Sequence, residues 1–141
     1  MKNLSQKLVK FFSLSLSDKC RLIAIWLTLF FVWSLLQILP FNIFLKIYRK
    51  SLSFPFASPR NIPHDKTAYF TTKAASLFPF SITCLPIAMT YKWLLRDDKS
   101  VYLKIGVQQK QGFEFHAWVE RFGKILINET QEDNFSLLWQ V

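Results

Sequence analysis

The hydrophobic residues follow two different patterns in the two halves of the chain. Between Arg21 and Lys46 no charged residue occurs, and the stretch Leu22 to Leu45 is almost continuously apolar. From Val101 to Val107, apolar residues alternate with Tyr102, Lys104 and Gly106, as in a strand with one buried face. Helices followed by antiparallel strands predict an α+β fold.

The first half divides at its prolines. Pro40 interrupts the long apolar stretch, so we expect one helix from about 18 to 38 and a shorter one from about 41 to 51, with Ser17 as N-cap of the first. Residues 1–16 predict a basic amphipathic lead helix, and residues 51–65, with three prolines, predict a loop. Two further helices are expected, over 66–78 and from about 84 to 95.

The second half predicts a small antiparallel meander. We expect strands over 101–107, 113–121 and 124–128, and a fourth over 135–140. The turns between the first three fall at 108–112 and at Phe122–Gly123. We therefore expect a helical region over 1–65 and a core of helices and strands over 66–141, packed as one compact domain.

The apolar stretch has two interpretations. About 20 apolar residues span a bilayer, so 22–45 is a transmembrane candidate by length. Basic residues on both flanks give no orientation, and a proline break leaves neither helix clearly long enough to span. A buried helix of a soluble domain is the alternative, and residues alone do not decide between them.

Composition narrows the classes of partner and cofactor. Lys and Arg outnumber Asp and Glu by 18 to 9, which favours an acidic partner. These charges are scattered, so no nucleic-acid partner is predicted. Cys20 and Cys84 form no disulfide framework or metal-binding spacing, and His64 and His116 stand alone, so no metal site and no cofactor are predicted.

Cys84 has the position of a nucleophile. It is expected in the first turn of a helix, after the candidate N-cap Thr83, and Pro86 is tolerated there because first-turn N–H groups have no helical acceptor. The positive end of the helix dipole favours a thiolate at this point. A lone cysteine is more often a small buried hydrophobe, which is our interpretation of Cys20.

His116 is the candidate base. It is expected in the middle of a strand, where alternation places it on one face with Glu114, Trp118 and Glu120. A lone histidine on a strand is more often structural, but a Cys opening a helix and a His on a later strand is the order found in papain-like and transglutaminase-like enzymes. Asn128 and Glu129 end the next strand, where a group that orients the imidazole belongs.

Four segments carry a family resemblance: Cys84-Leu85-Pro86-Ile87-Ala88, Trp93-Leu94-Leu95, Leu103-Lys104-Ile105-Gly106-Val107 and His116-Ala117-Trp118-Val119-Glu120. In this order and spacing they resemble the lasso-peptide leader peptidases, cysteine proteases of the transglutaminase-like type. The resemblance covers about residues 66–130. Further upstream, only the long apolar helix followed by Pro40-Phe41 is similar in style.

The resemblance implies a Cys-His-acid triad and a pathway. Cys84 and His116 match the family's nucleophile and base, whereas the family's usual Asp is replaced here by Asn128-Glu129, and either residue is a candidate for the third role. Trp118 is the candidate for substrate binding. The resemblance implies cleavage of a lasso precursor peptide delivered by a separate leader-recognition protein, with a lasso cyclase closing the macrolactam.

The resemblance also favours a core helix in a cytoplasmic protein over a membrane segment, and it leaves membrane association open. Two alternatives remain at this point. A transglutaminase-like acyl transferase would use the same residues on another peptide. A small non-enzymatic membrane protein would depend on the 22–45 segment alone.

Overall fold

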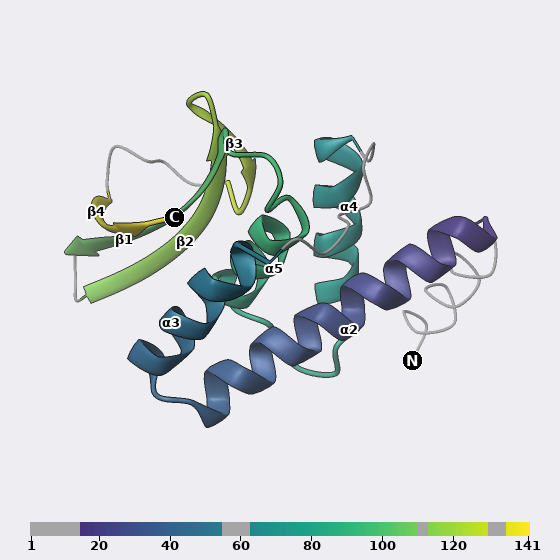
Figure 1. Ribbon diagram of the computed structural model, residues 1–141, viewed down its shortest axis with the longest axis horizontal. Helices are drawn as coiled ribbons and strands as arrows, with labels where there is room; N and C mark the ends of the chain where they lie inside the picture. Colours follow the sequence, from purple (N-terminus) through teal and green to yellow (C-terminus); the bar gives the residue numbers. More distant parts are fainter. Residues whose placement is uncertain (1–14, 55–62, 110–112, 130–134) are drawn as a thin grey trace.

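A computed structural model describes residues 15–54, 63–109, 113–129 and 135–141. Helices come first and strands follow, which confirms the α+β class (Figure 1). The helices are α2 (Leu16–Ile38), α3 (Phe41–Leu52), α4 (His64–Ala75) and α5 (Cys84–Leu94). The strands are β1 (Val101–Gln109), β2 (Phe113–Arg121), β3 (Lys124–Ile127) and β4 (Ser136–Gln140). The expected lead helix over 1–16 lies almost entirely outside the described residues.

The apolar stretch breaks at Pro40, as its sequence predicts. Leu39 ends α2 with a hydrogen bond from its N–H to the Leu35 carbonyl, and the Pro40 carbonyl then accepts the first bonds of α3. The cap of α2 differs from the expected one. Ser15, rather than Ser17, is the N-cap, because its hydroxyl oxygen accepts a hydrogen bond from the Asp18 N–H, three residues on.

One face of α2 is buried in the helical layer. Leu22, Ile25 and Leu29 pack in a cluster with Phe70 and Ala74 of α4 and with Phe78. Trp26 stacks on Phe78 with ring centroids 5.0 Å apart. The opposite face of α2 is apolar and exposed.

The four strands form one antiparallel sheet in the order β3-β2-β1-β4. The first three form the expected meander, but β4 returns to pair with the far side of β1. Main-chain bonds in both directions between Leu103 and Val141 extend this pairing. As a result, β2 and β1 are the two inner strands.

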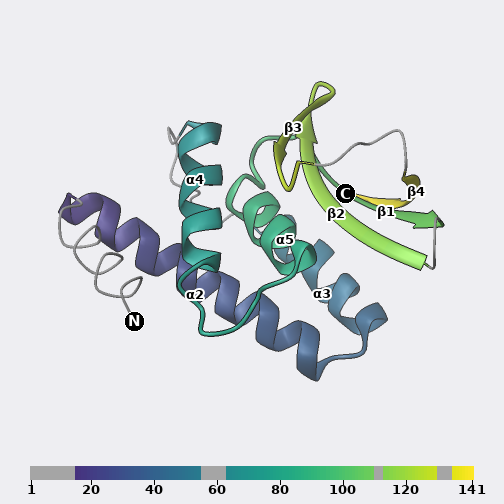
Figure 2. The same ribbon diagram turned by 180° about the vertical axis from the view of Figure 1, so that it is seen from behind.

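Helix α5 lies between the sheet and the other helices (Figures 1 and 2). Its buried residues meet the inner face of β1, β2 and β3 on one side and α2 and α3 on the other. The Tyr48 hydroxyl of α3 donates to the Met89 carbonyl of α5 over 2.7 Å. This core contains the following buried side chains: Val32, Phe44, Tyr48, Ala88, Met89, Tyr91, Val101, Leu103, Ala117, Val119 and Ile127. The core joins residues from both regions expected from the sequence.

Candidate active site

Cys84 is the first residue of α5, as predicted. Thr83 precedes it in an extended conformation, and the Thr83 side chain makes no capping hydrogen bond. The thiol is free and partly exposed, and the residue packs against the main core. The positive end of the α5 dipole therefore lies at the thiol and stabilises an anion there. Cys20 is also a free thiol, but it is exposed on the outer face of α2 and is not the first residue of its helix.

His116 lies on the inner strand β2, half-buried, opposite Gly106 of β1. Its Nε2 is 3.1 Å from the main-chain carbonyl oxygen of Asn128. A carbonyl oxygen only accepts, so Nε2 carries the proton in this contact and donates it. In the neutral ring, Nδ1 then keeps its lone pair, which is the state that a general base needs.

Asn128 connects β2 to the start of α5. Its side-chain amide donates to the Cys84 carbonyl over 2.7 Å and to the Ala117 carbonyl over 2.8 Å. Both partners are acceptors, so both belong to the NH₂ group, and both of its donors are used. The backbone of Asn128 has φ 59°, a left-handed conformation that asparagine tolerates better than most residues.

Asn128 contacts both Cys84 and His116, but these two residues lie on different sides of the sheet. Ala117 packs toward α5, so strand alternation places His116 on the other face of β2. Strand β3 pairs with β2 only from Val119 to Arg121, and no strand among the described residues pairs with this edge of β2 next to His116. In the part of the chain that the structure describes, hydrogen bonds link Cys84 and His116 through Asn128 and not directly. Catalytic hydrogen bonds often tighten only when substrate binds, so direct Cys84–His116 contact stays a prediction.

Two aromatic side chains, Trp118 and Phe135, pack against the imidazole of His116. The His116 ring lies 6.2 Å from the Trp118 ring at an interplanar angle of 19° and 5.5 Å from the Phe135 ring. Gly106 makes this packing possible, because a Cβ there would lie 2.9 Å from Phe135 Cβ and 3.0 Å from two Trp118 ring carbons. Gly106 and Phe135 are not among the site residues expected from the sequence. The single signal was the glycine at an alternating strand position.

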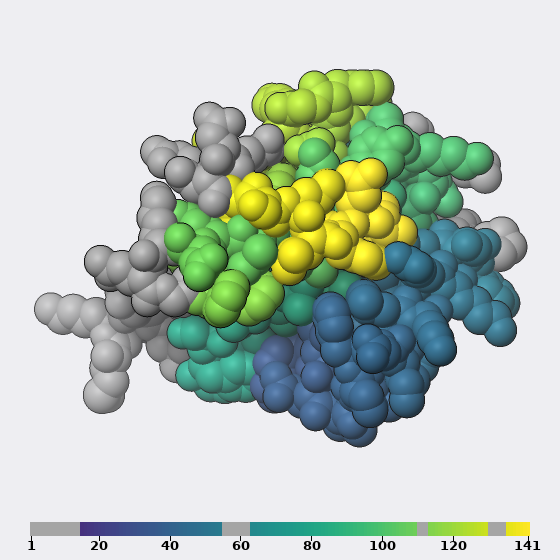
Figure 3. All heavy atoms as spheres, turned by 90° about the vertical axis from the view of Figure 1, so that its left-hand side faces the viewer, coloured from purple at the N-terminus to yellow at the C-terminus, as the bar shows by residue number. Residues whose placement is uncertain are grey.

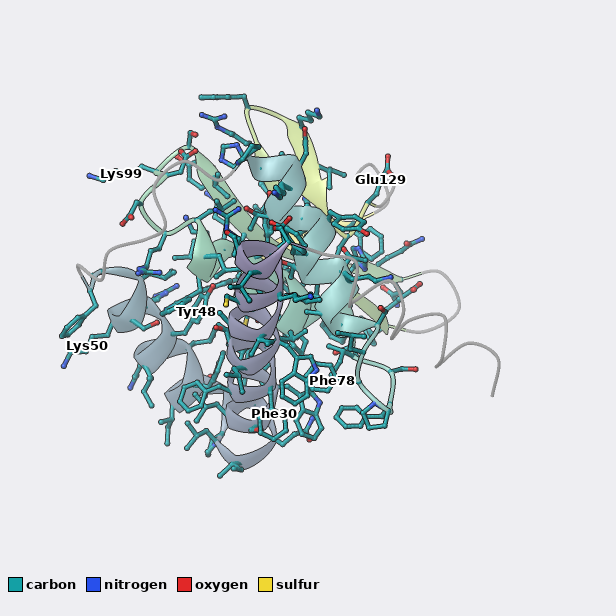
Figure 4. The ribbon with its side chains drawn as sticks, turned by 90° about the vertical axis from the view of Figure 1, so that its right-hand side faces the viewer. Phe30, Tyr48, Lys50, Phe78, Lys99 and Glu129 are labelled. Carbon is teal, nitrogen blue, oxygen red and sulfur yellow. The ribbon has the colours of Figure 1, made fainter. Side chains whose placement is uncertain are left out.

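Trp118 and the nearby carboxylates differ in their surroundings. Trp118 is 3% exposed, and its indole N–H points to the carboxylate of Glu120. Glu120 also forms an ion pair with Lys104. Glu114 and Glu129 are exposed, and Glu129 projects outward (Figure 4). Trp118 thus offers little surface to a substrate as it stands, and its role in substrate binding stays a prediction.

Comparison with known proteins decides the family. A family model described as "Transglutaminase-like superfamily" matches residues 36–140, from the end of α2 through β4. The chain belongs to this superfamily. No curated protein and no solved structure is significantly similar to it.

The match gives the arrangement of Cys84 and His116 a chemical context. The transglutaminase-like superfamily generally includes cysteine proteases, and its domain indicates cysteine-protease or acyl-transfer chemistry. The family match, over residues 36–140, spans the boundary at residue 65 between the two regions expected from the sequence.

This transglutaminase-like domain has a pocket next to its candidate nucleophile. A cavity of about 560 Å³ lies at the start of α5, and Thr83 and Leu85, the two neighbours of Cys84, line it. Its other lining residues come from the end of α2, the start of α3, the loop before α5 and the first turn of α5: Trp33, Leu36, Gln37, Phe41, Phe80, Ser81 and Pro86. A pocket of this kind suits one or two apolar side chains of a peptide.

A polar cluster at the opposite end of α5 links α4, β2 and the turn after α5. Asp98, in the turn after α5, lies 3.2 Å from His64 of α4 and 3.4 Å from Arg121 of β2. Burial by itself raises the pKa of Asp98, but hydrogen bonds from Ser100 and the charges of Arg121 and His64 together hold it below its usual value. In the part of the chain that the structure describes, no group of three or more His, Cys, Asp or Glu residues could hold a metal ion.

Proposed function

We propose that the protein is a cysteine peptidase that removes the leader from a lasso-peptide precursor, with Cys84 as nucleophile and His116 as base. The observation that carries this proposal is the link through Asn128. Its side chain holds the first residue of α5 and its main-chain carbonyl holds the imidazole. The resemblance of the segments around Cys84 and His116 to the leader peptidases supplies the substrate class.

The proposed reaction begins at the thiol. His116 Nδ1 takes the Cys84 proton, the sulfur attacks the scissile carbonyl, and the same nitrogen returns the proton to the departing amine. Water then hydrolyses the thioester. First-turn N–H groups of α5 have no side-chain cap and are suited to stabilise the oxyanion.

This reaction requires His116 to move toward Cys84. The ring must bring Nδ1 to the thiol around the open edge of β2 while Nε2–H keeps its bond to the Asn128 carbonyl. Asn128 is therefore proposed as the orienting residue, acting through its main chain. Glu129, the other candidate, is exposed, and within the described residues the imidazole donates its hydrogen bond to Asn128.

The proposal includes two protein partners and a cytoplasmic location. A separate leader-binding protein would present the precursor, and a macrolactam-forming cyclase would act on the released core peptide. The net charge of +9 is compatible with an acidic partner surface. Presentation by a partner raises the local peptide concentration at the site, so cleavage is expected to be slow without it.

The test is an assay of leader release, followed by mass spectrometry, with and without the leader-binding protein. Cys84→Ala and His116→Ala should abolish cleavage, whereas Cys20→Ala is the matched control and should retain it. If an added amine is incorporated and no free core peptide appears, the enzyme is an acyl transferase instead. Activity that survives Cys84→Ala would refute the proposal.

A further inference from the structure

The outward face of α2 is apolar along most of its length. Residues that point away from α4 and α5 include four large exposed hydrophobic side chains: Ile23, Leu27, Phe31 and Ile38. Phe31 is 63% exposed. Surface helices of soluble domains usually carry polar residues on this side, so a continuous apolar face indicates an interaction surface.

Helix α3 continues the same surface. An apolar cavity of about 600 Å³ lies between α2 and α3, with Leu27, Phe31 and Ile47 at its exposed margin. Ile43 and Ile47, one turn apart on α3, are both about half exposed. We call this surface, formed by the outward residues of α2 together with Ile43 and Ile47, the α2–α3 face.

Basic residues border the α2–α3 face. Helical spacing places Lys46 and Lys50 next to the stripe formed by Ile43 and Ile47, and Lys50 projects away from the molecule (Figure 4). In Figure 3, α3 lies at the surface below β4, where Arg49 contacts Trp139. The two helices carry five basic residues and one acidic residue: Lys19, Arg21, Lys46, Arg49, Lys50 and Asp18.

The packing of α2 against the rest of the domain favours a helix that lies on a membrane over one that spans it. By length and composition α2 is able to cross a bilayer. Its other face, however, is buried against α4 and α5 through Leu22, Ile25 and Leu29, and Phe30 stacks against Phe78 of the same helical layer (Figure 4). A helix held by the domain along one side has only its outer side available to lipid.

We propose that the α2–α3 face attaches the protein to an anionic lipid bilayer, with α2 lying in the plane of the headgroups. The exposed apolar side chains enter the boundary between headgroups and acyl chains, and the basic border pairs with lipid phosphates. An exposed apolar surface with aromatic side chains, bordered by Lys or Arg, is typical of helical segments that lie on a membrane. The charge excess selects an anionic surface over a neutral one.

Sedimentation of the full chain with vesicles tests this. Vesicles of phosphatidylcholine mixed with phosphatidylglycerol should bind the protein, and added salt should weaken the binding. Vesicles of phosphatidylcholine alone should bind it far less. Phe31→Glu should lower binding at least about tenfold, because it places a charge in the apolar contact. Phe122→Glu, at an 83% exposed position in the β2–β3 turn, is the matched control and should bind normally.

A second pair of variants tests the basic border. Lys46→Glu with Lys50→Glu should reduce binding to anionic vesicles by about tenfold or more, since each basic residue at such a surface contributes about fivefold in affinity. Lys99→Glu with Lys124→Glu changes the net charge equally at exposed sites outside α2 and α3. Equal losses in both double variants would overturn the proposal, as would equal binding to neutral and anionic vesicles. Dimerisation in solution that Phe31→Glu abolishes, without vesicle binding, would assign the face to a second copy instead.

Discussion

Replacing Asn128 should weaken the fold and the site together, because one side chain holds two structural elements. In Asn128→Ala, the carbonyls of Cys84 and Ala117 both lose their donor. The main-chain carbonyl of residue 128, which holds the His116 ring, remains. The variant therefore tests the anchoring of α5 separately from the orientation of the imidazole.

The expected magnitude follows from two terms. Each hydrogen bond contributes about 1 kcal/mol net, so the pair contributes about 2 kcal/mol. Alanine at φ 59° adds about 1 kcal/mol, because its Cβ disfavours the left-handed region. Asn128→Ala should thus lower the free energy of unfolding by about 3 kcal/mol, a large part of what a small domain has.

Glycine at the same position separates the two terms. Asn128→Gly loses the same hydrogen bonds, but glycine adopts positive φ without strain. Allowing for the greater freedom of glycine in the unfolded chain, we expect this variant to be more stable than Asn128→Ala by about 0.5–1 kcal/mol. Asn42→Ala, at an exposed position on α3, is the control and should change stability by less than about 0.5 kcal/mol.

Urea denaturation of the four proteins, followed by tryptophan fluorescence, measures these differences. Leader cleavage should fall in both Asn128 variants, since the start of α5 is no longer tied to β2. A loss of stability below about 0.5 kcal/mol in Asn128→Ala would refute the anchoring role. Greater stability of the alanine variant than of the glycine variant would refute the assignment of backbone strain.

Three further predictions concern other parts of the molecule. Gly106→Ala should lower the free energy of unfolding, measured by urea denaturation, by about 1–3 kcal/mol, because the added methyl group overlaps Phe135 and Trp118. Gly123→Ala is the control: no atom lies within 4 Å of the added methyl group, so only the strain of its φ of 75° should lower stability, by about 1 kcal/mol. Equal losses of stability in the two variants would contradict the packing argument. Because the pKa of Asp98 is lowered in the fold, its ionised form contributes stability that is present above the ordinary pKa and is lost as pH falls through the folded-state pKa. Asp98→Asn should therefore be less stable than the native chain at neutral pH but equally stable at strongly acid pH. A stability difference that persists in acid would disprove the role of the Asp98 charge. Leu36→Trp should narrow the pocket beside Cys84. Cleavage of precursors with a bulky residue at the cleavage site should then slow more than cleavage of precursors with a small residue there. An equal change in the cleavage rates of both kinds of precursor would place the cleavage-site side chain elsewhere.

The sequence predicts the elements of this fold well because they depend on local signals. The proline at 40 and the change of period after Ser100 fix most helix and strand boundaries within a few residues. The cap of α2 was placed two residues too late, since alternating serines at 13, 15 and 17 all suit a cap and the choice depends on which one reaches a free N–H. The return of β4 to β1 could not be predicted, because strand pairing across the chain leaves no local pattern.

The candidate site divides in the same way. A cysteine at a helix start and a histidine within a strand are visible in the sequence, and both lie in the expected elements. The double role of Asn128 is not visible, because its partners are main-chain carbonyls contributed by distant segments. The packing of Phe135 over Gly106 likewise depends on the pairing of β4 with β1.

A main-chain oxygen beside the imidazole has an evolutionary consequence. Every residue type presents a carbonyl, so this contact constrains the path of the backbone at position 128 and not the chemical identity of the side chain. The side chain there is then free to acquire a separate task, here the tethering of α5. In the mechanism proposed above, mutation can therefore replace an acidic partner while the imidazole keeps its proton in place, and enzymes of this kind need no aspartate at that position. A search that requires an aspartate after the third strand would pass over such enzymes, whereas one that requires a left-handed residue at the end of that strand would find them.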